Sequence, residues 1–392
     1  MDFSRVDLSA GDREFLDSVR AFLAKHVTED VLRRARASGD GFDEELHLAM
    51  GAQGWLERET SGVEDGGLSP IRRRIWELER RRARVPLVTW GATMMILQAV
   101  RLYGSPELLD EVMTGVCSGE IRFAMGYTEP EGGSDIATCK TRAVRRGDDW
   151  IINGQKMFTS GAHNCRYVFL LTNTDPAGLR HRNLTMFLVP LDSNGIHVQG
   201  LRTVEGERTN ITNYDDVRVP DRYRIGEVND GWRVLSGPLS AEHGAGGPDP
   251  EGLSDIAIMG NFATTMAVTA DQVTASVAKA HDGRRRLDNS VVAYRLGRVY
   301  ARIEAASSAQ SIFGRVAIAQ SMREVAPDLM DILGENAALT VDAQGAVIGG
   351  AAEYLYRWAP LIGIYGGSLE VFRNMIARHV LGLGKPNYAR PK

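Results

Sequence analysis

The chain contains 392 residues, of which 43% are hydrophobic and 24% charged, and its formal net charge is −4. This composition is ordinary for a globular protein and argues against a disordered chain or a fibrous repeat. The slightly negative charge gives no reason to expect a nucleic-acid partner. A chain of this length is expected to form two or three structural units, at roughly 100–200 residues per domain.

Cysteines and apolar runs indicate the compartment. Cys117, Cys139 and Cys165 are too few and too far apart for a disulfide framework or a Cys-x-x-Cys metal site, which favours a reducing compartment. The N-terminus lacks a basic start followed by an apolar run, and no stretch approaches ~18 uninterrupted apolar residues. We therefore expect a cytoplasmic protein without a membrane segment. The eight histidines show no metal-ligand spacing, so no metal site is expected.

The first third of the chain is predicted to be helical. Apolar residues recur at helical spacing from Phe15 to Leu23, and a second helix is predicted around residues 45–55. In SPIRRRIWELERRRARVP, Ser69 and Pro70 fit an N-cap and a first helical residue. Its arginines are interleaved with glutamates, so we interpret it as a solvated or subunit-facing surface rather than a phosphate-binding stripe.

After about residue 121 the pattern changes to short β-rich runs separated by turn residues, which predicts a β domain. These runs are WIINGQKMF, YVFLLTN, LTMFLVPL, IHVQGL and YDDVRVP. The Asn153-Gly154 pair lies between apolar runs and predicts a hairpin turn, since both residues tolerate the positive φ of a type I′ turn.

Helical periodicity returns at about Gly231. Long helical segments are predicted at residues 256–273, 291–309, 315–333 and 371–381. The fold class is therefore mainly α with a central β domain. We expect domains at residues 1–120, 121–228 and 229–392.

Common catalytic signatures are absent from the sequence. GAGGPDPEG at residues 244–252 does not satisfy G-x-G-x-x-G, and no HExxH, P-loop or GxSxG pattern occurs. Two unusual segments remain, MGYTEPEGGSD at 125–135 and INGQKMFTSG at 152–161. The first offers backbone N–H groups and hydroxyls to a polar or anionic ligand, and the second offers an aromatic ring and hydroxyls to a flat heterocycle. Taken singly, each is also compatible with an ordinary turn or strand end.

Four segments, in this order, resemble the acyl-CoA dehydrogenase family. YTEPEGGSD is similar to the flavin-loop motif, INGQKMFTSG to the flavin-stacking strand, DVRVPDRYRIGEVNDGW to the exit from the β domain, and IYGGSLEVFRNMIARHVLGL to the C-terminal signature. The resemblance spans nearly the whole chain. It implies an N-terminal helical domain, a middle β-barrel-like domain and a C-terminal four-helix bundle, with FAD and acyl-CoA bound where they meet.

The resemblance also implies roles for individual residues in the flavin segments. Contacts to the flavin and its ribityl and pyrophosphate parts are implied for Tyr127, Thr128, Gly133 and Ser134. Ser134 would also lie near the thioester substrate. Phe158 would pack against the isoalloxazine ring, where the family often has tryptophan, and Ser160 would hydrogen-bond near flavin N5.

The C-terminal segment corresponds to the loop that closes over substrate and flavin in the family. Substrate contacts are implied for Tyr365, Gly366 and Gly367, and cofactor contacts for Ser368 and Glu370. The family reaction takes a proton from Cα of an acyl thioester while a hydride leaves Cβ for flavin N5, which gives the trans-2-enoyl thioester. Such a site needs donors to the thioester oxygen and a carboxylate base. Gly366 stands where many members have that carboxylate, so it supplies a backbone N–H but no base.

Another subgroup carries its base at the start of a helix that follows the β domain. Glu242 in LSAEH corresponds to the glutamate of that subgroup's L-x-x-E-R pattern and is our candidate base, although His243 replaces the arginine. The alternative is a surface glutamate near a helix start, favoured by the helix dipole. The Gly- and Pro-rich residues that follow are expected to interrupt or delay the helix. Glu251 or, more remotely, Asp249 therefore stays open as the carboxylate that reaches the substrate.

Further departures from the family pattern concern assembly. The segment KAHDGRRRLDNS at residues 279–290 lacks the Phe-Gly of the Arg-x-x-Phe-Gly segment with which one subunit reaches its neighbour's FAD. Asp331 and Glu335 stand where the family commonly has a flavin-contacting glutamine and a glycine. The chain thus resembles the base-carrying subunit of the heteromeric acyl-CoA dehydrogenases of actinobacterial steroid breakdown. This implies a homo- or heterotetramer with a second acyl-CoA dehydrogenase-like subunit and an electron-transfer acceptor protein.

Three functions stay open from the sequence. The first is an FAD-dependent acyl-CoA dehydrogenase that acts on a bulky, for example steroid-derived, acyl group. The second is a related flavin enzyme of secondary metabolism, such as an oxygenase or a dehydrogenase of carrier-protein-bound acyl groups, because fold does not fix chemistry. The third is a non-catalytic partner subunit of a heteromeric dehydrogenase.

Overall fold

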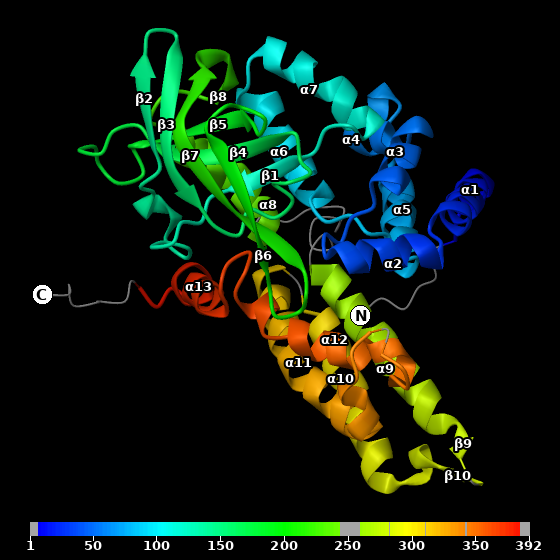
Figure 1. Ribbon diagram of the computed structural model, residues 1–392. Coiled ribbons are helices and arrows are strands. Elements are labelled where there is room, and N and C mark those ends of the chain that lie inside the picture. The colour runs from blue at the N-terminus through cyan, green and yellow to red at the C-terminus, as the bar shows by residue number, and fades with distance from the viewer. Residues whose placement is uncertain (1–6, 244–258, 282, 310, 342, 385–392) are drawn as a thin grey trace, which may run out of the picture. The chain divides into compact units, whose positions relative to one another are not determined.

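The computed structural model describes residues 7–243, 259–281, 283–309, 311–341 and 343–384. The elements follow the predicted order of helices, strands and helices (Figure 1). By its internal contacts the chain divides into two compact units, Met1–Leu239 and Ser240–Lys392. The first unit holds the N-terminal helices, the β domain and most of α8 (Gly231–His243), and the second holds the other C-terminal helices. The domain boundaries at residues 120 and 228 stay predictions.

The N-terminal part is helical, as predicted. Its helices are α1 (Ala10–His26), α2 (Glu29–Ser38), α3 (Glu44–Ala52), α4 (Trp55–Thr60), α5 (Pro70–Arg82), α6 (Trp90–Tyr103) and α7 (Pro106–Ser118). Phe15, Val19, Phe22 and Leu23 of α1 are buried, and Ser69 caps α5 by accepting a hydrogen bond from the Arg72 N–H. The helix predicted around residues 45–55 is divided between α3 and α4.

A buried carboxylate organises the core of these helices. The Trp55 ring stacks on the Trp76 ring with 4.7 Å between centroids. Glu59 Oε2 accepts hydrogen bonds from the indole N–H groups of Trp76 and Trp90, each at 3.1 Å. Its other oxygen pairs with Arg80 Nη2 at 2.8 Å. Because a buried charge is costly unless it is paired and hydrogen-bonded, this network explains why one arginine of α5 turns inward.

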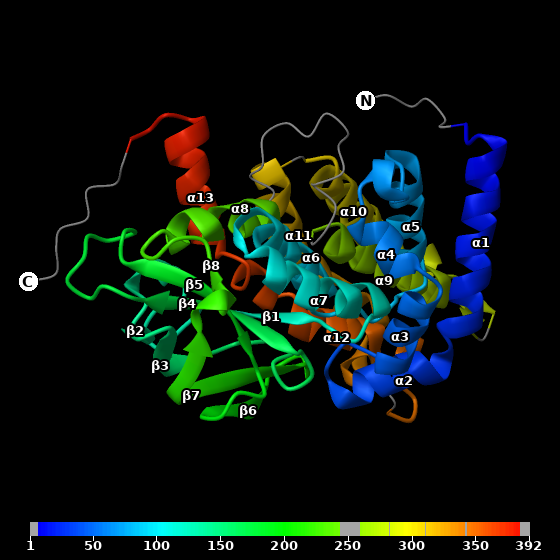
Figure 2. The same cartoon turned by 90° about the horizontal axis from the view of Figure 1, so that it is seen from above.

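The β domain is built on one sheet. Its strands are β1 (Phe123–Gly126), β2 (Arg142–Arg146), β3 (Asp149–Lys156), β4 (Tyr167–Asn173), β5 (Leu184–Pro190), β6 (Ile196–Arg202), β7 (Arg208–Pro220) and β8 (Arg224–Ile225). The order across the sheet is β6-β7-β3-β2-β4-β5-β8, and β1 adds to β4 in parallel. β4 and β5 are apolar and buried along almost their whole length, and α6 lies beside β1 (Figure 2).

The Asn153-Gly154 pair does not form a hairpin turn, contrary to the prediction. Both residues lie inside β3, where the pairing with β7 shifts register between Ile152 and Gly154, as at a β-bulge. Gly154 has φ +150°, and a Cβ there would lie 2.7 Å from Thr141 Cα. The close approach of the chain before β2 therefore requires glycine. The turn between β2 and β3 lies instead around Gly147.

The C-terminal part is again helical. Its helices are α8 (Gly231–His243), α9 (Met259–Ala278), α10 (Ser290–Ser307), α11 (Ser311–Leu333), α12 (Ala351–Trp358) and α13 (Leu369–Met375), which continues as a π-helical turn, Ile376–Val380. α9, α10, α11 and α12 pack on one another around an apolar core that includes Met266, Val299, Met322 and Leu355. Within the described ranges, no helix has the length and apolar character needed to cross a membrane.

Candidate functional site

The fold brings the two unusual segments of the β domain side by side. The Met157 N–H at the end of β3 donates a hydrogen bond to the Thr128 carbonyl in the loop after β1, at 2.8 Å. Lys156 Nζ donates to the Tyr127 carbonyl at 3.2 Å. Segments about thirty residues apart in the sequence thus form one surface.

A buried ion pair lies beneath this surface. Lys156 Nζ lies 2.8 Å from Glu129 Oε1, and the Lys156 side chain is fully buried. The carboxylate also accepts hydrogen bonds from the backbone N–H groups of Lys140 and Thr141, at 2.7 and 2.8 Å, and from Thr141 Oγ1. Burial alone would raise the pKa of Glu129, but the Lys156 charge and these hydrogen bonds outweigh it and hold the pKa at about 2. The Glu129 carboxylate is therefore charged at neutral pH.

The glycines after Glu129 make a tight turn with an open backbone. Glu129 and Gly132 exchange two backbone hydrogen bonds, at 3.0 and 3.1 Å. A Cβ on Gly132 would lie 2.6 Å from Thr138 Oγ1, so this position accepts only glycine without rearrangement. Gly133 and Ser134 are exposed, which leaves their backbone and the hydroxyl accessible to a ligand.

Phe158 is presented in a strained conformation. Its φ is +58° and 55% of its surface is exposed, both of which are unusual for an aromatic residue. Asn210 holds the next residue from both sides, because its carbonyl accepts from the Thr159 N–H at 2.9 Å and its Nδ2 donates to the Thr159 carbonyl at 3.0 Å. Ser160 Oγ donates to Thr209 Oγ1 at 3.1 Å. Strain of this kind persists where the surroundings fix it, and it is typical of ligand-binding sites.

The C-terminal loop between α12 and α13 contains two left-handed glycines. Gly366 has φ +61° and Gly367 has φ +92°. Ser368 then caps α13 by accepting from the Val371 N–H at 3.3 Å. Among the described residues, the Gly366 N–H has no hydrogen-bond acceptor. Hydrogen bonds from its own backbone N–H and from Ser368 lower the pKa of Glu370, which is exposed at the start of α13.

Side chains of the same unit hold this loop. The Tyr365 hydroxyl accepts a hydrogen bond from Trp358 Nε1 at 3.1 Å, and its ring lies 6.2 Å from the Phe262 ring. The Tyr365 carbonyl accepts from Arg315 Nη2 at 2.6 Å. The loop is therefore anchored at Tyr365, immediately before the two glycines.

The comparison with known families is decisive. Domain models of acyl-CoA dehydrogenases match the chain at residues 9–120 (N-terminal domain), 124–216 (middle domain) and 307–381 (C-terminal domain). The chain belongs to the acyl-CoA dehydrogenase family. This confirms the resemblance, the mainly α fold with its central β domain, and the assignment to an oxidoreductase family whose members conventionally use FAD.

Individual relatives are similar over most or all of their length. Acyl-CoA dehydrogenase FadE26 of Mycobacterium tuberculosis is 28% identical, over 98% of this chain and 100% of the relative. FadE29 of the same organism is 34% identical, over 62% of this chain and 63% of its own length.

Solved structures with similar folds include two complexes. The Tcur3481-Tcur3483 steroid ACAD has a TM-score of 0.83 and 28% identity, and covers 99% of this chain and 100% of its own. The ChsE4-ChsE5 complex from Mycobacterium tuberculosis has a TM-score of 0.81 and 26% identity, and covers 98% and 100% respectively.

The candidate base of this acyl-CoA dehydrogenase lies in a helix but not at its start. Glu242 is the twelfth residue of α8, so it has neither the helix-start position of the subgroup's base nor the dipole stabilisation of a helix start, and a surface glutamate stays the alternative. Its side chain lies outside the described part of the structure. Glu251 and Asp249, the other two candidate carboxylates, also lie outside the described residues, as does the Gly- and Pro-rich segment expected to interrupt the helix. The choice of base stays a prediction.

The segment that lacks the family's Phe-Gly contains two short strands. β9 (Ala280–His281) pairs antiparallel with β10 (Arg284–Arg285), and the arginines of β10 are exposed. Asp331, at the position of a flavin-contacting glutamine, instead pairs with Arg295 at 2.8 Å. Glu335 begins a 3-10 turn after α11.

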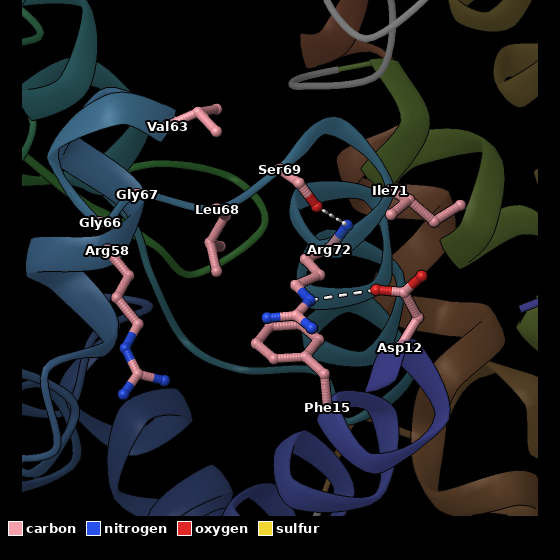
Figure 3. Close-up of a pocket in the computed structure, with 10 residues that line it drawn as sticks. All are labelled: Asp12, Phe15, Arg58, Val63, Gly66, Gly67, Leu68, Ser69, Ile71 and Arg72. Atoms are coloured by element: carbon pink, nitrogen blue, oxygen red, sulfur yellow. Dashed lines mark hydrogen bonds and ion pairs between the residues drawn. The ribbon is translucent and has the colours of Figure 1, made fainter. Parts of the chain in front are cut away.

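A pocket of 660 Å³ opens among the N-terminal helices (Figure 3). It is lined by Asp12, Phe15, Arg58, Val63, Gly66, Gly67, Leu68, Ser69, Ile71 and Arg72. None of the predicted site residues contributes to it. Arg72, one of the two arginines that line the pocket, donates from Nε to Asp12 Oδ1 at 3.0 Å and is therefore paired with a carboxylate of the same pocket. We assign this pocket no part in the family chemistry.

Sequence reasoning did not single out Lys156, Asn210 and Arg315, which form hydrogen bonds to backbone carbonyls in the predicted site segments. Side chains of a strand alternate between its two faces, and Lys156 lies on the buried face of β3 together with Trp150 and Ile152. Arg315 lies among the buried residues of α11. A charged residue at a position where the pattern predicts a buried apolar residue is the signal that could have revealed Lys156 and Arg315. No local pattern distinguishes Asn210, because its role depends on a contact with Thr159.

Proposed function

We propose that this chain is an FAD-dependent acyl-CoA dehydrogenase that converts an acyl-CoA thioester to the trans-2-enoyl-CoA. The observation that carries the proposal is the C-terminal loop, where Gly366 offers an N–H without an acceptor among the described residues and no side-chain carboxylate. Family membership over all three domains supports the reaction class.

The loop is suited to stabilise negative charge on the thioester oxygen. Cα–H is a weak acid in water, and its removal places charge on the thioester oxygen. A fixed backbone donor directed at that oxygen lowers the barrier without needing to reorganise during the reaction. Removal of one such donor typically costs a factor of about 10²–10³ in rate. A backbone N–H survives side-chain replacement, so Gly366 is compatible with catalysis.

The residues of the β domain fit a flavin. The exposed, strained ring of Phe158 is available for stacking on a flat heterocycle, and the open backbone at Gly133 and Ser134 suits the polar parts of FAD. FAD, when bound, supplies the acceptor for the hydride that leaves Cβ. Phe158 and Tyr127 would hold the ring system, and Thr128, Ser134 and Ser160 would supply hydrogen bonds.

Glu242 is the proposed base. It would accept the Cα proton on its carboxylate, in place of the carboxylate that the C-terminal loop lacks. A general base contributes typically 10²–10⁴-fold to such a rate.

The proposed substrate is bulky, such as a steroid-derived acyl-CoA, and the proposed assembly is a tetramer with a second acyl-CoA dehydrogenase-like subunit. Support comes from the similarity to a steroid ACAD and to the ChsE4-ChsE5 complex, each named for two components. The β9–β10 segment, with exposed arginines in place of Phe-Gly, supports a flavin site completed by a different partner. An electron-transfer protein is the proposed acceptor.

A second candidate function is a non-catalytic subunit that shapes a companion enzyme, because Gly366 supplies no carboxylate base.

Both proposals are tested by adding an acyl-CoA, including a steroid-derived one, to the purified flavin-loaded protein, alone and with a co-expressed partner. Bleaching of the flavin absorption, reversed by an artificial electron acceptor, is the expected result. Rapid reoxidation by O₂ with an oxygenated product would favour the related flavin oxygenase, and bleaching that survives loss of every candidate carboxylate in this chain would favour the non-catalytic subunit.

A further inference from the structure

Arg315 is a buried arginine that contacts the C-terminal loop. Only 4% of its surface is exposed, and it lies near the start of α11. Its Nη2 donates to the Tyr365 carbonyl at 2.6 Å and approaches the Gly367 carbonyl at 3.5 Å. Its guanidinium carbon lies 5.3 Å from the centre of the Phe372 ring in α13. One side chain therefore contacts the residues on both sides of Gly366 and the helix that follows.

These contacts fix the direction of the Gly366 N–H. The Tyr365 carbonyl and the Gly366 N–H belong to one peptide unit, and no cis peptide bond is present in the described chain. In a trans peptide the C=O and N–H bonds point in opposite directions. Since Arg315 holds the Tyr365 oxygen, the Gly366 N–H must point away from Arg315, toward the other side of the loop.

An anchor is needed because the loop contains two glycines. Glycine populates positive and negative φ almost equally, so peptide units that flank Gly366 and Gly367 can rotate at little cost. A charged donor to the Tyr365 oxygen opposes that rotation. It also polarises the peptide unit, which strengthens the N–H as a donor.

We propose that Arg315 is a positioning residue for catalysis, which sets the orientation and donor strength of the Gly366 N–H toward the thioester oxygen. The inference rests on the proposed dehydrogenase function and deepens it. Arg315 does not itself touch the substrate. It replaces, through the backbone, part of the geometric control that a side chain on Gly366 would provide.

The test compares Arg315→Met and Arg315→Lys with Arg302→Met in the flavin-loaded protein and its partner. Arg302 lies on α10 and pairs with Glu324, away from the loop residues named above. Hydrogen exchange is measured at Ile364 and Tyr365, whose N–H groups donate to the Leu361 carbonyl. kcat and KM are measured with the acyl-CoA that bleaches the wild-type flavin.

We expect Arg315→Met to accelerate exchange at these amides about tenfold and to lower kcat by roughly 10–100-fold, with KM changed less than about threefold. Arg315→Lys should recover part of kcat, because it restores one charged donor but not the contact with the Phe372 ring. Arg302→Met should change neither quantity.

If Arg315 had a purely structural role, Arg315→Met would lower the thermal stability of the protein without lowering kcat more than it changes KM. Unchanged exchange or unchanged kcat in folded Arg315→Met would overturn the inference while leaving the dehydrogenase proposal intact. If the wild-type protein shows no flavin bleaching with any CoA thioester, the dehydrogenase proposal fails first and the inference fails with it.

Discussion

Lys156 and Glu129 form a buried ion pair that joins the end of β3 to the loop after β1, with 2.8 Å between Nζ and Oε1. These segments carry Phe158 on one side and Gly133 and Ser134 on the other. The ion pair therefore sets the spacing between the proposed stacking ring and the open backbone proposed to face the flavin.

Loss of one partner of this pair should destabilise the protein strongly. Lys156→Met leaves the Glu129 carboxylate buried and unpaired, which should lower the free energy of unfolding by about 3–5 kcal/mol. The measurement is denaturant unfolding at pH 7. The control is Lys140→Met, which removes the partner of Glu131 in an exposed pair and should have much less effect. Equal losses in the two variants would show that the Glu129–Lys156 pair is not a principal support of the fold.

A second buried group should make stability depend on pH. His47 is 1% exposed, and neither ring nitrogen has a hydrogen-bond partner in the described structure. Burial, with the nearby charges of Arg122 and Arg80, lowers the pKa of His47 from 6.5 to about 3. Between these values the unfolded chain binds a proton that the native state does not. The native state therefore loses stability as pH falls from about 6.5 toward 3, by at most about 1.4 kcal/mol per pH unit.

The His47→Phe variant should remove this slope between pH 6.5 and 4.5. Below 4.5 a slope should remain, because Glu129, with its pKa at about 2, must also be protonated as the protein unfolds in acid. The control is His197→Phe, at an exposed position on β6. Urea unfolding at half-unit pH steps measures the slopes. A His47→Phe protein with the wild-type slope would rule out His47 as the titrating group.

Phe158 should contribute to cofactor binding at a cost in stability. Phe158→Gly removes a side chain from a left-handed backbone conformation and should stabilise the flavin-free chain by about 1 kcal/mol, while it weakens FAD retention. Phe158→Trp, the residue that the family often carries, should keep the flavin. Flavin content after gel filtration and the melting temperature of the flavin-free protein provide the two readouts. Retention of FAD by Phe158→Gly at the wild-type level would contradict the stacking role.

The empty carboxylate position offers a gain-of-function test. Gly366 has φ +61°, a region that other residues enter at a cost of about 1–3 kcal/mol, so Gly366→Glu should fold with reduced stability. In a Glu242→Gln background, it should restore measurable flavin bleaching by an acyl-CoA. Gly366→Gln in the same background is the matched control. Equal bleaching by both double variants would show that a carboxylate at residue 366 cannot act as base.

Most of the fold was predictable because its signals are local. The alternation and turn residues of the β domain predicted β3 to β6 and the second half of β7, and helical spacing predicted α1, α5 and most of α9 to α11. The helices α2, α6, α7 and α12 were not predicted. The prediction of a turn at Asn153-Gly154 was wrong because a glycine is also suited to a β-bulge. The sequence pattern does not distinguish the two structures, since the bulge depends on the close approach of Thr141 to Gly154.

The candidate site was predictable only where its segments carry motifs, and the roles of its residues stay predictions. Tyr127 to Ser134 and Phe158 to Ser160 do form one surface, but the sequence did not indicate that Lys156 and Glu129 join them. Arg315 could not be linked to Gly366 from sequence alone, because fifty residues separate it from the loop and its partner atoms are backbone carbonyls. Every residue has a backbone carbonyl, so a sequence pattern cannot show which of them accepts a hydrogen bond from Arg315.

Pre-steady-state flavin bleaching by Glu242→Gln, in the fully assembled protein, tests the central claim most directly. Glutamine keeps the shape of the side chain and removes the proton acceptor, and Glu251→Gln serves as the matched control. We expect the rate of bleaching to fall by about 10²–10⁴-fold in Glu242→Gln with FAD content unchanged, and to stay near the wild-type rate in Glu251→Gln. A wild-type rate in Glu242→Gln would contradict the assignment of this chain's base to α8.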